Sequence, residues 1–321
     1  AAIESQNIFD WFKKLPWKKG HSPLQWTPDY EDYLLDIWAR ETFDDYWKQI
    51  GLCAEEYYDS FSDVPQVHMS AWYDPYSRTA TDNYVALSGF KKGPVSLLMG
   101  PWTHGARSVT YSGNVDFGQS AIIEHLAADF NHLRLRFFDR WLKGEDNGWS
   151  NQPRVQLQIR TTNGFVERHE NEWPIARTKW TRLYLDGSSR SLIEETVPGQ
   201  TPIKYQATGD GVTFFSDPTD RDSEITGPSS AKLFVSSETV DADLFVVLRV
   251  FSPDDSEIVF QGAIDPHTPI GQGWLRACDR MKCVGAVPLS IVTPGPSEWE
   301  AGVHRAKDAR AAWRAHLVAR A

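Results

Sequence analysis

The sequence has few cysteines, no long apolar run and no excess of positive charge, and each absence excludes a class of protein. Cys53, Cys278 and Cys283 form no CxxC pair, so neither a disulfide framework nor a structural zinc site is predicted. No apolar run approaches the ~20 residues that a membrane-spanning helix needs. The formal net charge of −10 opposes binding to the phosphates of nucleic acid, which depends on clusters of Lys and Arg.

The remaining composition is that of a globular protein, with 41% hydrophobic and 24% charged residues. A chain of 321 residues is long enough for two domains with separate cores. We expect no cofactor and no metal. A membrane partner is not expected either, because the sequence shows no basic amphipathic helix. The low cysteine content makes a cytoplasmic location the default expectation. The chain begins with Ala1 instead of methionine, which is typical of a fragment or of a mature chain.

Residues 1–60 are predicted to be helical and rich in aromatic side chains. Thr27 followed by Pro28 is typical of a helix start, because threonine caps a helix and proline suits its first position. A second helix is expected from Thr42 to Gly51. Two short helices with aromatic faces cannot bury themselves, so this segment should lie on a larger structure.

Residues 61–149 are predicted to form a parallel α/β structure. Apolar runs at 64–72 and 95–99 flank a predicted helix at 79–87, which Gly89 should end. A strand, a helix and a strand within about 40 residues are typical of a βαβ crossover with parallel strands. A long amphipathic helix at 121–142 should pack along this sheet.

Residues 150–280 are predicted to form an all-β domain. Short strand-like runs are separated there by clusters of Gly, Pro, Asp and Ser, which is typical of a β-sandwich, here a jelly roll. The expected strands include 155–159, 181–185, 231–236 and 244–251. Residues 281–321 are rich in alanine and arginine and are expected to form an atypical, helix-prone tail outside the sandwich.

A carboxylate and an imidazole follow the two strands of the predicted crossover. Asp74 comes directly after the first strand, and His104 follows the second. Because the carboxyl ends of parallel strands meet at one edge of a sheet, both side chains should reach that edge. An acid followed by a histidine is the order of an α/β-hydrolase triad, whose serine comes earlier in the chain. Asp74 is therefore predicted to orient His104, which would accept the proton of the serine.

Other side chains have weaker functional interpretations. Trp72, Tyr76 and Trp102 flank the predicted pair, and both substrate contact and core packing remain open for them.

Three further histidines are predicted to have no role in chemistry. His125 and His132 lie seven residues apart on the long helix, but a metal site would need two more ligands, so packing or surface positions are favoured. His68 lies within the first strand and is interpreted as a core histidine with satisfied hydrogen bonds.

Several segments together resemble the CocE/NonD hydrolase family, which is related to the Xaa-Pro dipeptidyl-peptidases. The main segments are VPQVHMSAWYD at 64–74 and GPWTHG at 100–105. Another matching segment lies between them at 81–84, and further ones follow at 112–118, 136–144 and 271–277. Several motifs in order are more specific than any one of them.

The resemblance extends over about residues 5–280 and implies an α/β-hydrolase portion followed by a jelly-roll domain. It implies that residues 1–60 form a helical lid, that Asp74 and His104 are the acid and base of a catalytic triad, and that Tyr76 helps to form an acyl pocket. The substrate would be a small ester, an amide or a peptide.

The sequence departs from the family pattern at the nucleophile, because it contains no Gly-x-Ser-x-Gly elbow. A similar segment at 227–231 follows the histidine and is predicted to be a turn before a strand. The serine is therefore expected outside this chain, which should be inactive alone. The sheet edge left unpaired would invite aggregation or partnering, for instance as a homodimer. A non-catalytic jelly-roll module that binds carbohydrate or another ligand is the alternative.

Overall fold

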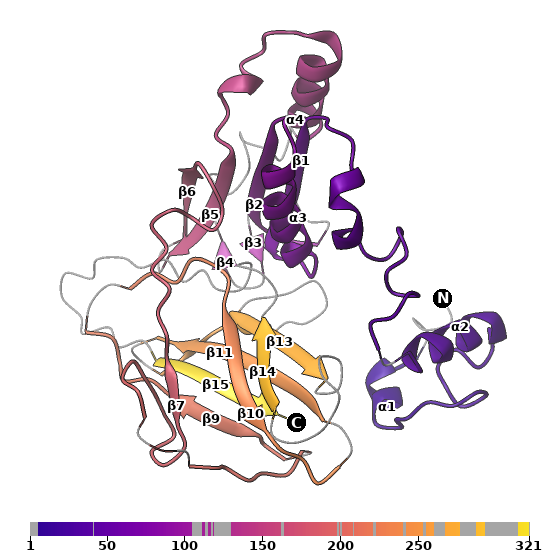
Figure 1. Cartoon of the computed structure of the whole chain (residues 1–321), viewed down its shortest axis with the longest axis vertical. Coiled ribbons are helices and arrows are strands. Elements are labelled where there is room, and N and C mark those ends of the chain that lie inside the picture. The colour runs from indigo at the N-terminus through magenta and orange to yellow at the C-terminus, as the bar shows by residue number, and fades with distance from the viewer. Residues whose placement is uncertain are drawn as a thin grey trace. The chain divides into compact units, whose positions relative to one another are not determined.

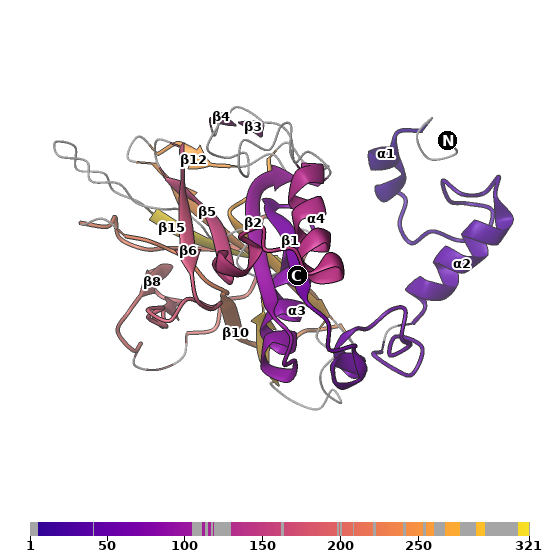
Figure 2. The same ribbon diagram turned by 90° about the horizontal axis from the view of Figure 1, so that it is seen from above.

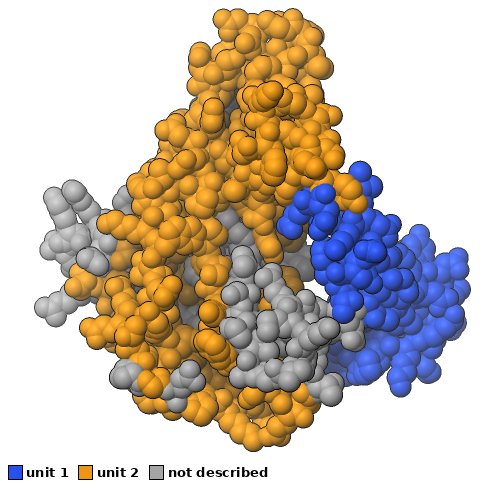
Figure 3. Space-filling model, viewed as in Figure 1, with its two compact units in different colours: residues 1–56 blue, residues 57–321 orange. Residues whose placement is uncertain are grey.

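The computed structural model contains two compact units, residues 1–56 and 57–321, and each is treated by itself (Figures 1 and 3). The structure describes residues 6–40, 42–104, 111–112, 115–116, 118, 130–161, 164–197, 199, 201–207, 209–220, 223–239, 242–252, 255–259, 267–276, 287–292 and 314–320.

The first unit contains the helices α1 (Ile8–Phe12) and α2 (Pro28–Trp38). Helix α2 begins where the sequence predicts, with Pro28 in its first turn. Thr27 precedes it, but the Thr27 hydroxyl donates to the carbonyl of Leu24 at 3.0 Å and does not cap the helix. The helix is tied to the preceding loop by Glu31, whose buried carboxylate accepts hydrogen bonds from the hydroxyl of Ser22 and the amide of Gly20.

The second helix predicted in this unit, from Thr42 to Gly51, is absent, and the chain forms successive turns there. One cause is local: the side chain of Asp44 accepts a hydrogen bond from the backbone amide of Tyr46 at 3.0 Å. Such a bond competes with the helical hydrogen bonds that the same amide could make. The helix prediction for this segment is therefore wrong.

The second unit begins, after the short helix η1 (Glu55–Ser60), with the predicted crossover. Strand β1 (Gln66–Tyr73), helix α3 (Ser77–Phe90) and strand β2 (Val95–Thr103) follow one another. The two strands pair in parallel, and α3 packs against both, which confirms the βαβ prediction. Helix α3 continues through Gly89 and ends at Phe90, before the extended backbone of Lys91, so it runs three residues beyond the predicted helix at 79–87.

Strands β5 (Val155–Thr161) and β6 (Gly164–Glu170) complete this sheet, whose order is β1-β2-β5-β6, as Figure 2 shows. Strand β5 pairs in parallel with β2, and β6 pairs antiparallel with β5. The spacing of apolar residues predicts the strand at 155–159 but not the sheet that the strand joins.

The long helix predicted at 121–142 is described only from residue 130 onwards, so its first half, with His125, lies outside the described residues. Helix α4 (Phe130–Phe138) continues into a π-helical turn, η3 (Asp139–Lys143). Gly144 ends the helix with a left-handed backbone, as predicted. Leu133 of α4 packs on the sheet against Ala71, Leu98 and Trp102.

The rest of the second unit is built from strands, as predicted, but it also includes the predicted tail. Its larger sheet has the order β12-β11-β15-β9-β8-β7, with β13 also paired to β11, and β10 pairs with β14. The strands are β7 (Tyr184–Asp186), β8 (Ser191–Ile193), β9 (Val212–Phe215), β10 (Ser230–Val235), β11 (Asp243–Phe251), β12 (Glu257–Ile258), β13 (Gly271–Arg276), β14 (Val287–Val292) and β15 (Arg314–Arg320). Shorter elements are β3 (Tyr111–Ser112), β4 (Val115–Asp116) and η4 (Trp149–Asn151).

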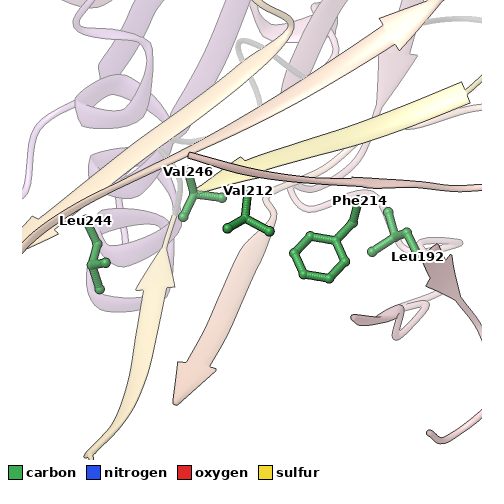
Figure 4. Packing of buried hydrophobic residues seen from close by; sticks show 5 residues of the cluster. All are labelled: Leu192, Val212, Phe214, Leu244 and Val246. Atoms are coloured by element: carbon green, nitrogen blue, oxygen red, sulfur yellow. The ribbon is translucent and has the colours of Figure 1, made fainter. Parts of the chain in front are cut away.

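Strand β15 corrects the prediction of a helix-prone tail, because it lies between β11 and β9 and pairs antiparallel with both. Pairing on both sides outweighs the helix propensity of its alanines and arginines. Gly227, with φ at 144°, turns the chain shortly before β10, as predicted for that segment. One core of this region is a cluster of buried side chains from β8, β9 and β11 (Figure 4). Its members are Leu192, Val212, Phe214, Leu244 and Val246.

Candidate active site

The tips of β1 and β2 bring the predicted acid and histidine together. Asp74 follows the last residue of β1 and His104 follows the last residue of β2, and Tyr73 lies opposite Thr103 in the parallel ladder. The two side chains are therefore level with each other. The Nδ1 atom of His104 lies 3.0 Å from Oδ2 of Asp74, which is hydrogen-bonding distance.

Asp74 is buried and held on both sides. Its side chain is 10% exposed, and Oδ1 accepts the backbone N–H of Tyr76 at 2.8 Å while Oδ2 faces the imidazole. Its backbone carbonyl accepts a bond from the amide of Ser77, in the first turn of α3. The turn between β1 and α3 thus fixes the orientation of the carboxylate.

His104 is exposed on the side away from Asp74, and its side chain is 53% accessible. An ionised carboxylate can only accept hydrogen bonds, so the neutral imidazole must carry its proton on Nδ1. Its Nε2 atom then presents a lone pair. The ring of Tyr76 stands edge-on to the imidazole, with 5.4 Å between the ring centroids. This arrangement can accept a proton at Nε2 and stabilise the resulting imidazolium.

Of the three aromatic residues that flank the pair, only Tyr76 is exposed, at 60%. Trp72 is 2% exposed, and its indole donates to the backbone carbonyl of Gln158 at 2.7 Å. Trp102 is 1% exposed and belongs to the cluster that packs against α4. Both tryptophans therefore pack in the core, which is one of the two interpretations that the sequence left open for them.

Two of the three histidines set aside in the sequence, His68 and His132, lie within the described residues. His68 lies in β1 with its Nε2 atom buried and without a hydrogen-bond partner among the described residues, so the prediction of a satisfied core histidine is wrong. Burial lowers the pKa of His68, because the charged form loses its hydration. His132 is on the exposed side of α4. Within the described ranges, no three His, Cys, Asp or Glu side chains are grouped as metal ligands.

Two structural features of the site were missed by the sequence analysis. The backbone amide of Tyr76 contacts Asp74, and no sequence pattern reports a main-chain donor of this kind. Gly100 is covered by the indole of Trp102: a Cβ atom there would lie 2.1 Å from the ring. The Gly100-Pro101 pair inside an apolar run was the available signal, because both residues are unusual within a central strand.

No helix in the described part of the chain is long and apolar enough to cross a bilayer.

Two family models match the chain. Residues 4–106, which include both Asp74 and His104, match the X-Pro dipeptidyl-peptidase (S15) family. Residues 147–288 match the X-Pro dipeptidyl-peptidase C-terminal non-catalytic domain.

Among curated relatives, a cocaine esterase from a Rhodococcus species is 28% identical over an alignment of 236 residues, and the match covers 61% of this chain and 39% of that protein. A solved CocE/NonD family hydrolase from Staphylococcus aureus matches with a TM-score of 0.69 and 18% identity, over 90% of this chain and 51% of that one. An aminopeptidase from a marine sediment archaeon of the Thaumarchaeota matches with a TM-score of 0.65 and 16% identity, over 90% and 52%.

The solved structures share the fold with this chain, and the chain spans about half of their length. It spans 39% of the length of the cocaine esterase. The fold is thus that of a hydrolase portion followed by a β-rich domain. Matches to both halves of this architecture, in the order found here, together support one assignment, that of a CocE/NonD family hydrolase.

Proposed function

We propose that this chain is part of a serine hydrolase that cleaves ester or amide bonds through an acyl-serine intermediate. The observation that carries the proposal is the buried Asp74 carboxylate hydrogen-bonded to Nδ1 of His104 at the tips of two parallel strands. Asp74 is the acid, His104 is the base, and the serine belongs to polypeptide outside this chain.

In the first half of the proposed reaction, Nε2 of His104 takes the proton of the serine hydroxyl while the oxygen attacks the substrate carbonyl. The imidazolium is stabilised by Asp74, which stays ionised. His104 then gives this proton to the leaving alkoxide or amine, and an acyl-serine remains. In the second half, His104 takes a proton from water, the hydroxide attacks the acyl group, and the proton returns to the serine.

Residues 1–60, which the sequence predicts to form a lid, are suited to that role over an apolar substrate, which is part of the proposal. They carry several large aromatic side chains on their surface, including Trp26 at 80%, Tyr30 at 70% and Tyr33 at 58% exposure. Exposed apolar surface of this extent is typical of an interaction or ligand-binding face. The β-rich region is proposed to be a jelly-roll domain; residues 147–288 match the C-terminal non-catalytic domain of the X-Pro dipeptidyl-peptidases.

For the substrate, we favour esters of bulky apolar acyl groups. Tyr76 lies exposed beside the imidazole and can contact an acyl group there. Amide substrates, including Xaa-Pro peptides, are the second choice, because the relatives are named both as esterases and as peptidases. A peptidase of this kind needs an anionic group to hold the substrate's amino terminus.

The test joins this chain to the N-terminal, Gly-x-Ser-x-Gly-bearing portion of an active family member. We expect this fusion to hydrolyse an aryl ester and to react with a fluorophosphonate at its serine, and we expect the chain alone to do neither. His104→Ala should abolish both activities, whereas His169→Ala, which removes an exposed imidazole from β6, should retain them. Ester turnover by the chain alone, or by the His104→Ala fusion, would contradict the proposal.

A further inference from the structure

The ladder between β1 and β2 changes register immediately before the candidate pair. Ala71 lies opposite Gly100, whereas Tyr73 lies opposite Thr103. One residue of β1 therefore faces two residues of β2, Pro101 and Trp102, in this interval. An extra residue on one strand is a β-bulge, which is over-represented beside active sites and re-aims the side chains that follow it.

The extra residue decides what lies opposite Asp74. If the register of Ala71 and Gly100 continued without the bulge, Asp74 would lie opposite Thr103, and His104 would lie one residue further along. Since side chains alternate between the two faces of a strand, this shift of one residue would also turn the imidazole to the other face. With the bulge, Asp74 and His104 each follow directly on the last pair of the ladder, Tyr73 and Thr103, and Nδ1 reaches the carboxylate at 3.0 Å.

The residues at the bulge have the chemistry that it requires. Pro101 has no backbone N–H to donate to a ladder; within strands proline is confined to edges, first residues and bulges, and the pairing of β2 with β5 has already ended at Met99. Gly100 has no side chain, and this absence leaves room for the indole of Trp102, which covers its backbone.

Packing holds the indole of Trp102 in this position. The ring is 1% exposed and contacts Ala71, Leu98 and Leu133. Its Nε1 atom is buried and has no hydrogen-bond partner among the described residues. A side chain that is held by its shape alone can be replaced by another flat ring more readily than by a small residue.

From these contacts we propose that Gly100, Pro101 and Trp102 form a register-setting bulge, in which Trp102 is a positioning residue that acts through His104. This inference rests on the proposed function, since it explains how the acid and base of that proposal come to face each other. In this proposal the bulge acts without contacting the substrate. It positions the two strand ends so that Asp74 and His104 can form their hydrogen bond.

The experiment measures the tautomer of His104 in the complete chain by ¹⁵N NMR of the imidazole at a pH where the ring is neutral. Asp74→Asn is the reference for a broken pair, and it should lose the excess of the Nδ1–H tautomer. Deletion of Pro101 should produce the same loss while circular dichroism shows an intact fold. A folded deletion variant that keeps the wild-type tautomer would overturn the inference.

Point variants decide the matter if the deletion variant does not fold. Trp102→Ala and Gly100→Ala should each reduce the population of the Nδ1–H tautomer. Trp102→Phe should retain it, because a phenyl ring can still lie over Gly100. Gly89→Ala is the matched glycine control, since nothing lies within 4 Å of the added methyl group. Leu157→Ala, a fully buried position on β5, controls for loss of stability alone.

The outcomes separate this inference from the proposed function. If Asp74→Asn leaves the tautomer unchanged, the acid–base pair itself is wrong and there is nothing for the bulge to position. If Asp74→Asn changes the tautomer but the bulge variants behave like Leu157→Ala, only the positioning role is overturned. If Trp102→Ala loses the tautomer and Trp102→Phe retains it, both stand.

Discussion

Two histidine–carboxylate pairs lie in the same four-stranded sheet, one at the tips of β1 and β2 and one on the outer strand β6. At the tips, Nδ1 of His104 lies 3.0 Å from Asp74; on β6, Nε2 of His169 lies 2.6 Å from Glu167. The shorter distance belongs to the pair for which we propose no function. Distance alone therefore does not identify a catalytic pair.

The two pairs differ in burial and in how their members are held. The side chain of Asp74 is 10% exposed and receives a backbone hydrogen bond, whereas that of Glu167 is 47% exposed. Glu167 and His169 are two residues apart on one strand, while Asp74 and His104 come from separate strands, 30 positions apart in sequence. An exposed pair is screened by water and contributes little, but a buried carboxylate in a fixed orientation can stabilise an imidazolium.

Removal of the two imidazoles should give the largest contrast. In a fusion that supplies the serine, His104→Ala should lower kcat by about 10⁶-fold, because the base of a triad acts as a unit with its nucleophile. His169→Ala should leave kcat unchanged. Steady-state hydrolysis of an aryl ester measures both values, and a comparable loss in the two variants would remove the distinction between the pairs.

Neutralisation of the two carboxylates should give the next largest contrast. Asp74→Asn should lower kcat by about 10⁴-fold, because the amide no longer holds the imidazole in the Nδ1–H tautomer. Glu167→Gln should have no effect on turnover. The same fusion and ester serve for the assay, and full activity of Asp74→Asn would show that the acid has no part in the reaction.

Truncation of one side chain on β5 and one on β6 tests whether the buried strand contributes more to the free energy of unfolding than its exposed neighbour. Leu157 is fully buried, and Leu157→Ala should lower the free energy of unfolding by about 2–5 kcal/mol. Val166 on β6 is 44% exposed, and Val166→Ala should cost no more than about 0.5 kcal/mol. Urea unfolding measures both, and equal losses would mean that β6 is packed as tightly as β5.

The smallest effect is expected from pH. Burial lowers the pKa of His68, so the unfolded chain binds the proton more readily than the folded chain. The contribution of His68 to stability is fully present above the unfolded-state pKa of about 6.5 and is lost as pH falls towards the folded-state pKa. His68→Gln should therefore reduce the loss of stability on acidification.

Thermal unfolding at a series of pH values measures this effect. His169→Gln, on the outer strand, controls for the removal of an imidazole at an exposed position. An unchanged pH dependence in His68→Gln would show that some other group causes the acid sensitivity.

The sequence predicts well the features that depend on neighbouring residues. The apolar runs around 64–72 and 95–99, with a helix between them, led to the parallel strands β1 and β2, and to Asp74 and His104 at one edge. Features that depend on distant partners were missed. The pairing of β5 with β2 was not predicted, and β15 was expected to be helical, since its partners β9 and β11 lie far away in the chain.

The sequence by itself determined that an acid and a histidine follow successive parallel strands, because strand order and the right-handed crossover bring such strand ends to one edge. Only the tertiary structure decided that the two side chains are level, that Asp74 is buried and that Trp102 lies over Gly100. These properties come from a register shift and from packing between separate elements. Residue type and spacing along one strand carry no record of the partner strand, so they could not be derived from the sequence.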